Sequence, residues 1–575
     1  MNTAQEAYFE WLSNPLIDEE TKKELREIAN DEREIEDRFY RKLAFGTGGL
    51  RGVIGAGSNR MNVYTVCLAT QGLADYVNES GGADQGVAIA FDSRIMSSEF
   101  SEAAALCLNA NGIRTYRFPE LRPTPELSFA VRELGCIAGI VITASHNPSE
   151  YNGYKVYWED GGQITPPHDR NIMEAVSKVT SLDLVRTMGR EEAEKKGLYH
   201  TIGPDLDDRY VKAVMGQSIH PDIIPGMADK IKIVYTPLNG AGNVPVRRIL
   251  RELGFTQVYV VPEQEMPDGR FPTLPYPNPE EPDAWKLALK LAERVQADIV
   301  LATDPDADRL GVYARDSETG KYVSFTGNMS GALICEYILR ERTLSGTMPA
   351  DPAVVETIVT TDLAKPIAKK YGAALYETLT GFKFIGEQIL RFEEQEKGNF
   401  LFGLEESYGC LAGTYARDKD ACVAVMMLCE LAAFYKNRNM TLVDAMHAVY
   451  EEYGYYKEGM SYLTLKGREG AERIAQIMLD MRSVTPSELA GMKVLALRDY
   501  RKGVRTDLVT GSVMPTGLPT SNVLYFELEN DAWCCVRPSG TEPKIKFYCG
   551  VKGISDRDAD EKMEHLLNYL TGELV

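Results

Sequence analysis

Three aspartates at alternate positions form the strongest local signal for chemistry in this chain. They lie in the segment Asp304-Pro305-Asp306-Ala307-Asp308-Arg309, directly after the apolar run 297–302. Carboxylates spaced in this way can converge on one hard cation, because oxygen ligands suit magnesium and calcium. An EF-hand loop would need glycine at its sixth position and glutamate at its twelfth, but Arg309 and Arg315 stand there. The segment predicts a magnesium site, and the preceding apolar strand disfavours the alternative of a solvated acidic turn.

A serine follows a second apolar run. Ser145 lies in Thr143-Ala144-Ser145-His146-Asn147-Pro148, after residues 136–142. An apolar run that stops at a polar, proline-ended turn is typical of a buried strand that leads into a loop. Such a loop can hold a hydroxyl where a ligand reaches it. Taken alone, the motif is better explained as a capping serine, so the other polar segments decide its interpretation.

A third segment, residues 537–544 (RPSGTEPK), has the composition of an anion-binding loop. The Arg537 guanidinium offers paired donors, Ser539 and Thr541 add hydroxyls, and Gly540 lets backbone N–H groups approach an anion. An ordinary turn between two strands is the alternative.

Two further segments place polar groups beside glycines. Residues 403–409 (GLEESYG) set Glu405 and Ser407 where they could accept or share hydrogen bonds with sugar hydroxyls, although a helix N-terminus would also explain them. Gly381 and Lys383 form a weaker segment of the same kind. Residues 46–52 (GTGGLRG) are glycine-rich around Arg51, but they fit neither a dinucleotide-binding motif nor a Walker loop.

Composition limits the partners of this chain. Its 575 residues carry a net charge of −21 with a pI near 5.0, so we expect no nonspecific binding to nucleic acid. Ten cysteines without a C-x-x-C pair indicate a reducing compartment. The N-terminus does not resemble a signal peptide, and no apolar stretch approaches the ~18 residues of a membrane span. We therefore expect a cytoplasmic protein that does not enter a membrane.

Strand-like and helix-like segments alternate along the chain, which predicts α/β layers. The predicted strands are 86–91, 137–142, 232–235, 297–302 and 353–359, and a helix is predicted for 97–111. Residues 1 to about 44 favour a helical extension, and the proline-rich stretch 262–283 favours a loop. A strand at 523–528 and a helix at 558–570 predict a C-terminal α+β domain. In α/β sheets ligands gather at the carboxyl ends of the strands, where the serine and the aspartates lie.

Together these segments resemble the α-D-phosphohexomutase superfamily, and within it the bacterial phosphoglucomutases with Phe45-Gly46-Thr47-Gly48-Gly49-Leu50-Arg51-Gly52 near the start. The resemblance extends from about residue 40 to 560 with all four segments in family order. It implies four domains around a central cleft: three related mixed α/β-sheet domains and a C-terminal α+β domain. We expect boundaries at 1–205, 206–320, 321–450 and 451–575.

By position, the resemblance also implies roles for individual residues. Ser145 would carry a phosphate, and Asp304, Asp306 and Asp308 would hold Mg²⁺ together with a phosphoserine oxygen. Groups implied at the reacting centre are Arg51, His146, Lys155, Arg309 and Lys419. Sugar and phosphate ligands would be Gly381, Lys383, Glu405, Ser407, Arg537, Ser539, Gly540 and Thr541. Some members have a histidine soon after the sugar-loop serine, whereas this chain has Tyr408-Gly409-Cys410, and Lys419 matches a cation placed slightly later.

The implied activity is interconversion of α-D-glucose 1-phosphate and glucose 6-phosphate, with bound glucose 1,6-bisphosphate as intermediate and activator. Sugar phosphates would be the only partners implied, and the sequence leaves the oligomeric state open. Phosphomannomutase and phosphopentomutase activity on the same scaffold are alternatives, as are a metal-dependent phosphatase and an inactive binding paralogue. The intact serine and aspartate segments count against the inactive paralogue.

Overall fold

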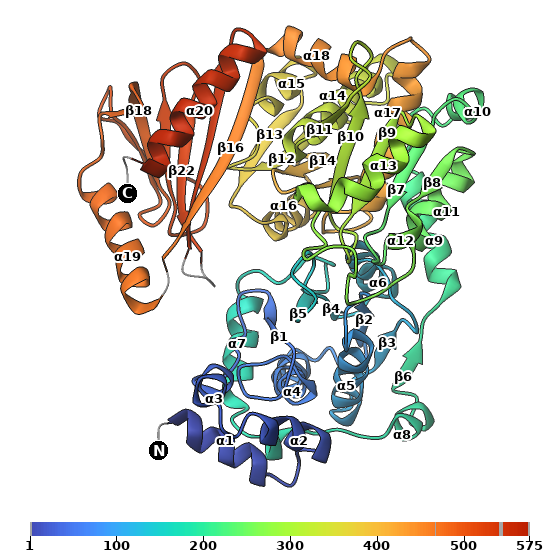
Figure 1. Cartoon of the computed structure of the whole chain (residues 1–575), viewed down its shortest axis with the longest axis vertical. Coiled ribbons are helices and arrows are strands. Elements are labelled where there is room, and N and C mark those ends of the chain that lie inside the picture. The colour runs from blue at the N-terminus through green and yellow to red at the C-terminus, as the bar shows by residue number, and fades with distance from the viewer. Residues whose placement is uncertain (1–2, 466, 540–543, 573–575) are drawn as a thin grey trace. The chain divides into compact units, whose positions relative to one another are not determined.

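The computed structural model describes residues 3–465, 467–539 and 544–572 (Figure 1). The chain divides into two compact units. Unit 1 comprises Met1–Gly327, Phe382–Gly403 and Ser407–Leu442, and unit 2 comprises Asn328–Gly381, Leu404–Glu406 and Val443–Val575. The two units alternate along the sequence, so segments that are adjacent in the chain can belong to different units.

The N-terminal extension folds into three short helices: α1 (Thr3–Ser13), α2 (Glu19–Glu27) and α3 (Glu32–Phe39). Asp18 and Asp31 begin α2 and α3, because their carboxylates accept backbone N–H groups of the first turn. Tyr8, Leu25 and Phe39 are buried together in a small core of their own. The predicted helical extension is confirmed.

The first sheet has six strands in the order β1-β5-β4-β2-β3-β6. They are β1 (Gly49–Val53), β2 (Val87–Phe91), β3 (Thr115–Arg117), β4 (Ala138–Ile142), β5 (Tyr151–Trp158) and β6 (Tyr199–Thr201). Strands β2, β3, β4 and β6 are parallel, whereas β5 runs antiparallel to β4 and β1. The helices are α4 (Val63–Glu79), α5 (Ser97–Ala110), α6 (Thr124–Leu134), α7 (His168–Lys178), η1 (Leu182–Leu184) and α8 (Arg190–Lys195). Every residue of β2 and β4 is buried, as expected for parallel strands covered on both faces.

The second sheet has the order β11-β10-β9-β7-β8. Its strands are β7 (Ile233–Thr236), β8 (Val258–Val260), β9 (Ile299–Thr303), β10 (Leu310–Arg315) and β11 (Tyr322–Phe325). The helices are α9 (Pro204–Met215), α10 (Ile224–Met227), α11 (Asn243–Leu253), α12 (Pro262–Glu265), η2 (Pro282–Trp285) and α13 (Lys286–Val295). The stretch 262–283, predicted as loop throughout, contains α12 and the start of η2. The prediction was wrong there because proline is compatible with the first turn of a helix.

The third α/β region contains strands β12 (Pro352–Thr357), β13 (Ala374–Thr378), β14 (Asn399–Glu405) and β15 (Gly409–Ala412). Its helices are α14 (Gly327–Ser345), α15 (Ala364–Lys370), α16 (Phe382–Gln395), α17 (Ala421–Lys436) and α18 (Leu442–Tyr453). Within unit 2, β12 and β13 pair in parallel. Within unit 1, α17 is buried at all but its last residue, and the Asp420 carboxylate begins this helix by accepting two backbone N–H groups.

The C-terminal sheet is antiparallel and lies wholly in unit 2, in the order β16-β23-β22-β21-β18-β19-β20, with β17 paired to β18. Its strands are β16 (Tyr455–Thr464), β17 (Glu488–Leu489), β18 (Met492–Asp499), β19 (Val504–Asp507), β20 (Val513–Pro515), β21 (Leu524–Leu528), β22 (Trp533–Pro538) and β23 (Lys544–Gly553). The helices are α19 (Gly467–Ser483) and α20 (Asp556–Gly572), and α20 packs against β16 and β23 (Figure 1). The predicted α+β domain is confirmed.

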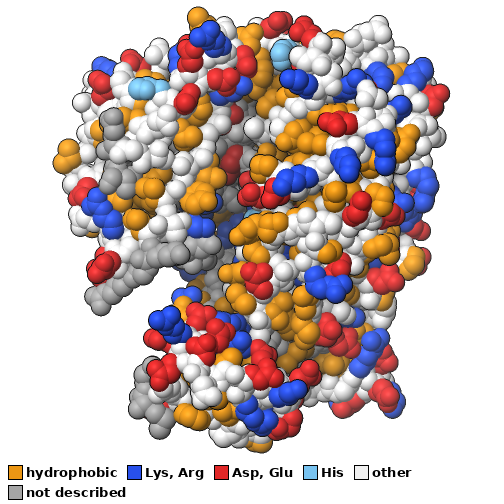
Figure 2. Space-filling model, in the orientation of Figure 1, with side chains coloured by type: hydrophobic (Ala, Val, Ile, Leu, Met, Phe, Trp, Pro, Cys, Tyr) orange, Lys and Arg blue, Asp and Glu red, His pale blue; other side chains and the backbone are white. Residues whose placement is uncertain are grey.

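Acidic and basic side chains are interspersed over the described surface on the face that Figure 2 shows. The chain has 84 acidic and 63 basic residues, so the overall field is negative. An anionic ligand therefore needs cations concentrated at its binding site.

Candidate active site

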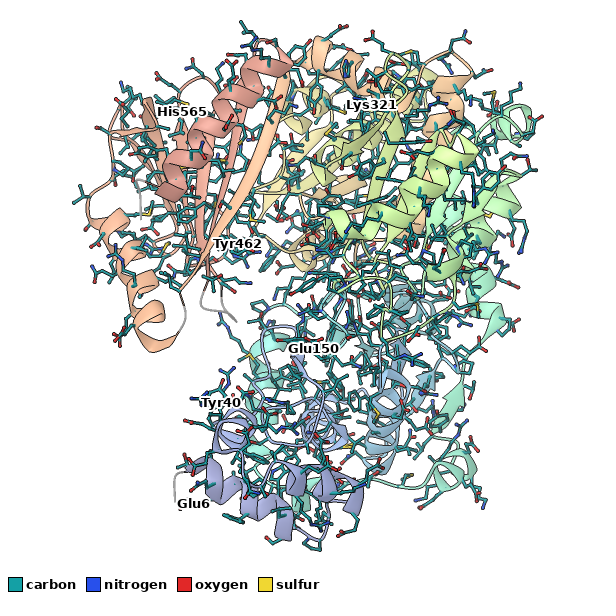
Figure 3. All side chains as sticks on the ribbon, in the orientation of Figure 1. Glu6, Tyr40, Glu150, Lys321, Tyr462 and His565 are labelled. Atoms are coloured by element: carbon teal, nitrogen blue, oxygen red, sulfur yellow. The ribbon has the colours of Figure 1, made fainter. Side chains whose placement is uncertain are left out.

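The serine loop, residues 143–150, begins where β4 ends and leads into β5; Figure 3 labels Glu150 at its exit. Ser145 is 4% exposed and has a left-handed backbone with φ of 51°. Thr143 supports this turn, because its Oγ1 accepts the Ser145 N–H at 2.8 Å. A left-handed conformation is costly for a residue with a Cβ and persists only where its surroundings enforce it. The loop therefore holds the serine hydroxyl in one orientation.

The metal loop, residues 304–309, begins at the end of β9, whose five residues are all buried. One carboxylate oxygen each from Asp304, Asp306 and Asp308 lie within 4.8 Å of one another, and each residue is at most 1% exposed. Asp304 Oδ1 fixes the turn by accepting the N–H groups of Asp308 at 3.1 Å and Arg309 at 3.0 Å. Ala307 is left-handed, with φ of 52°. The loop thus brings three carboxylates into one small volume.

The carboxylate triplet fits a metal ion with oxygen ligands. Asp306 Oδ1 and Asp308 Oδ1 are buried without a hydrogen-bond partner among the described residues, and such oxygens are costly to bury. Burial, followed by repulsion from Asp306 and Asp308, raises the pKa of Asp304 well above its ordinary value. A divalent cation would satisfy the two oxygens and offset the repulsion.

The serine loop and the metal loop meet at one hydrogen bond. Ser145 Oγ donates to Asp304 Oδ2 at 2.7 Å, across 159 residues of sequence. His146 Nδ1 lies 3.2 Å from the same Oγ. Thr124, at the start of α6, donates its hydroxyl to Asp306 Oδ2 at 2.9 Å. The structure thus brings the predicted phosphate carrier and the predicted metal ligands together, while their roles stay predictions.

Two lysines add positive charge to this centre. Lys155 Nζ, from β5, donates to Asp306 Oδ2 at 2.8 Å and lies 3.5 Å from Asp308 Oδ2. Lys419 Nζ lies 3.1 Å from Asp308 Oδ2. Burial alone lowers the pKa of Lys155, but the carboxylates of Asp306 and Asp308 outweigh it and raise that pKa. Burial alone raises the pKa of Asp306, but Lys155 holds it far below its ordinary value. Both groups are therefore charged at neutral pH.

Two arginines complete the predicted reacting centre. Arg309 Nη1 pairs with Glu280 Oε1 at 2.5 Å, and Arg51 Nη1, from β1, donates to Asn147 Oδ1 at 3.3 Å. Burial, followed by the positive charges of Arg309 and Arg51, lowers the pKa of His146 well below its ordinary value. The imidazole is therefore neutral at neutral pH.

The remaining predicted ligand-binding residues lie in both units. In unit 1, Ser407 follows β14, and Lys383 lies in the first turn of α16, where its Nζ donates to the Thr47 carbonyl at 3.2 Å. Burial lowers the pKa of Lys383. Those in unit 2 are Gly381, Glu405, Arg537 and Ser539. Gly540 and Thr541 lie outside the described residues.

Within unit 2, one residue of the predicted sugar-binding segment (403–409) and one of the predicted phosphate-binding segment (537–544) both shift the pKa of Tyr548. Burial, followed by the negative charge of Glu406, raises the pKa of Tyr548, and Arg537 opposes this shift. Glu406 and Arg537 thus both act on the phenol of Tyr548, which lies on β23. A carboxylate suits the hydroxyls of a sugar and a guanidinium suits its phosphate.

Three residues near the reacting centre received no role from the sequence: Arg94, Thr124 and Glu280. Arg94 binds the backbone of the serine loop, whereas Thr124 and Glu280 contact Asp306 and Arg309. A signal existed for Arg94, because Asp92-Ser93-Arg94 directly follows a buried strand of the same sheet. The local sequence around Thr124 and Glu280 carries no comparable signal.

Family models match three consecutive stretches of the chain. They describe α/β/α domains I, II and III of phosphoglucomutase/phosphomannomutase and match residues 42–183, 208–319 and 326–453. The chain therefore belongs to the phosphoglucomutase/phosphomannomutase family. With the C-terminal sheet, it has an α/β fold of four domains. Ser145 falls within the first match and the aspartate triplet within the second.

Individual relatives agree with this assignment. The chain is 37% identical over 509 residues to a phosphoglucomutase from Staphylococcus epidermidis, an alignment that covers 88% of this chain and 90% of that protein. Its fold is similar to a putative phosphomannomutase from Thermus thermophilus, with a TM-score of 0.67 and 21% identity over 92% of this chain and 98% of that one. It is also similar to the open form of parafusin from Paramecium, with a TM-score of 0.68 and 18% identity over 92% and 95%. The chain is thus an enzyme of the mutase class.

Within the described ranges, every helix is too short or too polar to span a membrane.

Proposed function

We propose that this protein is a phosphoglucomutase that interconverts α-D-glucose 1-phosphate and glucose 6-phosphate. The observation that carries the proposal is the hydrogen bond from Ser145 Oγ to Asp304, which sets a buried hydroxyl against a cluster of metal-type ligands. The relative from Staphylococcus epidermidis, named a phosphoglucomutase, supports the choice of sugar.

Ser145 carries the phosphoryl group in the resting enzyme. The O6 of glucose 1-phosphate attacks the phosphorus, the bond to Ser145 Oγ breaks, and glucose 1,6-bisphosphate forms. The bisphosphate reorients in the site, and Ser145 Oγ attacks the phosphate at C1, which releases glucose 6-phosphate. Phosphoryl transfer requires alignment and charge stabilisation more than covalent chemistry, and the fixed orientation of the serine loop supplies the alignment.

Asp304, Asp306 and Asp308, together with an oxygen of the phosphorylated Ser145, would hold Mg²⁺. Bound there, the ion would supply positive charge to the phosphoryl oxygens. Three carboxylates leave an octahedral ion short of ligands, and magnesium commonly completes its shell with phosphate or water. The Oδ1 atoms of Asp306 and Asp308, which are buried without a hydrogen bond among the described residues, support this assignment.

The cations at the centre neutralise charge that develops during transfer, and these are Arg51, Lys155, Arg309 and Lys419. The proton that O6 loses passes to the departing Ser145 Oγ by way of a lysine or His146. The Nδ1 of His146 lies 3.2 Å from Oγ, which is within reach for such a transfer. The second transfer runs the same route in reverse.

The sugar and the phosphate that is not being transferred are bound separately. Glu405, Ser407, Gly381 and Lys383 read the sugar. Arg537, Ser539, Gly540 and Thr541 bind the distal phosphate. Both sets of residues accept the sugar in two orientations, because each phosphate of the bisphosphate must reach Ser145 in turn. The four domain boundaries and a cytoplasmic location stay predictions.

The experiment is an isomerisation assay with added glucose 1,6-bisphosphate, run in parallel with glucose, mannose and ribose 1-phosphates, alongside phosphopeptide mapping of Ser145. The fastest turnover with mannose or ribose would assign a phosphomannomutase or phosphopentomutase instead. Release of inorganic phosphate without isomerisation would assign a phosphatase. Full activity of a Ser145→Ala enzyme would sink the serine mechanism.

A further inference from the structure

Arg94 binds the inner side of the serine loop through four backbone carbonyls. It is the third residue after β2 and is 3% exposed. Its Nη1 donates to the carbonyl oxygens of Pro148 at 2.7 Å and Tyr151 at 3.0 Å. Its Nη2 donates to those of Ser145 at 2.5 Å and Asn147. All four N–H bonds on the two terminal nitrogens are therefore used.

All four carbonyls face one guanidinium. One of them belongs to Ser145, whose backbone is left-handed with φ of 51°. Buried carbonyl groups need donors, and Arg94 supplies them for this turn. Removing the guanidinium would leave the turn without the contacts that hold this conformation, and the hydroxyl would no longer be fixed against Asp304.

Arg94 is itself held on three sides. The side chains of Asp92 and Arg94 are both buried. Asp92 Oδ2 lies 3.4 Å from Arg94 Nε, and Asp92 Oδ1 accepts the backbone N–H of Arg94 at 2.9 Å. The ring of Phe271 lies beneath the guanidinium, 5.1 Å from centroid to Cζ. Gly269 approaches the backbone so closely that a Cβ there would lie 2.4 Å from Ile95 N and 2.7 Å from the Arg94 carbonyl carbon. The guanidinium therefore occupies a fixed position.

We propose that Arg94 is a positioning residue that sets Ser145 Oγ at its distance from Asp304. The inference rests on the proposed role of Ser145 in phosphoryl transfer. Arg94 acts through backbone carbonyls of the loop. A lysine at this position would keep the charge, but its single nitrogen cannot donate to four carbonyls from two fixed points.

The test compares Arg94→Lys with Arg117→Lys in the full-length enzyme. Arg117 is a matched control, because it is 6% exposed, lies on β3 of the same sheet, and donates to Ser98 and Ser101, outside the serine loop. We expect Arg94→Lys to lower kcat about 100-fold with KM within about 3-fold, since a misplacement near 1 Å costs about that much. Amide hydrogen exchange in residues 145–151 should accelerate in Arg94→Lys only, even where both variants lose the same thermal stability.

A kcat in Arg94→Lys equal to that in Arg117→Lys, or unchanged exchange in 145–151, would overturn the inference. If Arg94→Lys does not fold, Asp92→Asn replaces it, because that change keeps the guanidinium and weakens its anchor. We then expect a kcat about 10-fold lower, and a normal kcat would overturn the inference. Ser145→Ala separates the two proposals: full activity in that variant sinks the serine mechanism, whereas loss of activity beside a normal Arg94→Lys sinks only the role of Arg94.

Discussion

The two loops that meet at Ser145 differ in construction from the predicted phosphate-binding segment, which begins at Arg537. The serine and metal loops follow fully buried strands, and left-handed residues and side-chain acceptors fix their turns. The phosphate-binding segment instead leaves β22 of an antiparallel sheet, and Arg537 and Ser539 are partly exposed. This contrast fits the proposed function, in which the reacting centre must be rigid and the distal phosphate-binding residues must accept the sugar in two orientations.

The largest effect is expected from Ser145→Ala, compared with Ser539→Ala. Ser145→Ala removes the only proposed phosphate carrier, so kcat should fall by at least about 10⁴-fold. Ser539→Ala removes one hydrogen bond to the bound phosphate, so it should raise KM by about 10-fold and leave kcat nearly unchanged. Steady-state kinetics and the mass of the phosphopeptide containing residue 145 measure both. Similar kcat values for the two variants would contradict the proposed difference between the reacting centre and the phosphate-binding segment.

A smaller but still large effect is expected from Asp304→Asn. The amide oxygen can still accept the N–H groups of Asp308 and Arg309, while one of three mutually repelling charges disappears. We expect kcat to fall by about 10²–10³-fold and the rise in Tm on adding Mg²⁺ to vanish. The metal-free variant should melt at least as high as the metal-free wild type, because burial and repulsion raise the pKa of Asp304.

The control for this prediction is Asp298→Asn, which removes a carboxylate that pairs with Lys436 Nζ at 2.6 Å just before β9. It should leave the Mg²⁺-dependent shift in Tm intact. An Asp304→Asn protein that Mg²⁺ still stabilises as strongly as the wild type would refute the metal assignment.

Arg537→Ala tests the predicted phosphate-binding segment, and we expect an intermediate effect on KM. A charge-assisted hydrogen bond to phosphate is worth about 1.5–3 kcal/mol, so KM should rise about 10–100-fold while kcat changes by less than about 3-fold. Arg505→Ala is the control, since Arg505 lies on β19 of the same sheet and pairs with Glu527 Oε2 at 2.6 Å. If Arg537→Ala lowered kcat as steeply as Asp304→Asn does, Arg537 would belong to the reacting centre.

The parts of the fold that the sequence predicts well are the fully apolar strands. The predicted strands 86–91, 137–142 and 297–302 correspond to β2, β4 and β9 within two residues at each end. Continuous burial leaves a continuous apolar run, and its end marks the strand terminus. Strand β1 has no such run, because only Leu50 and Gly52 of its five residues are buried.

The same reasoning explains which parts of the site the sequence could indicate. Ser145 and Asp304 were identifiable because each lies at the end of an apolar run, where α/β sheets bind ligands. Arg94 also follows an apolar run, but the loops that Arg94 and Thr124 contact are distant from them in sequence, so these contacts depend on the tertiary fold. The left-handed backbone at Ser145 likewise lies among contacts with Thr143 and Arg94 that local propensity does not encode.

The smallest effect is expected from substituting Glu458 on β16, a carboxyl group of unit 2 that contrasts with the aspartate triplet of unit 1. Glu458 is only partly exposed, and it accepts hydrogen bonds from Thr361 Oγ1 at 2.5 Å and Asn328 Nδ2 at 3.1 Å. Burial raises its pKa from 4.5 to about 7, although the bond from Thr361 opposes this shift. Lys457 also opposes the shift, but burial outweighs it, so the group takes up a proton more readily than an exposed carboxylate.

The sign of the resulting pH dependence follows from linkage. Because the folded-state pKa lies above that of the unfolded chain, the stabilising contribution is complete below about pH 4 and is lost as the pH rises through about 7. Glu458→Gln should therefore reduce the loss of unfolding free energy between pH 5.5 and pH 8.5 by about 1–3 kcal/mol. Urea denaturation at both pH values measures this, with the exposed Glu488→Gln on β17 as control. An identical pH dependence in wild type and Glu458→Gln would show that Glu458 is already ionised in the folded protein, as a solvated carboxylate is.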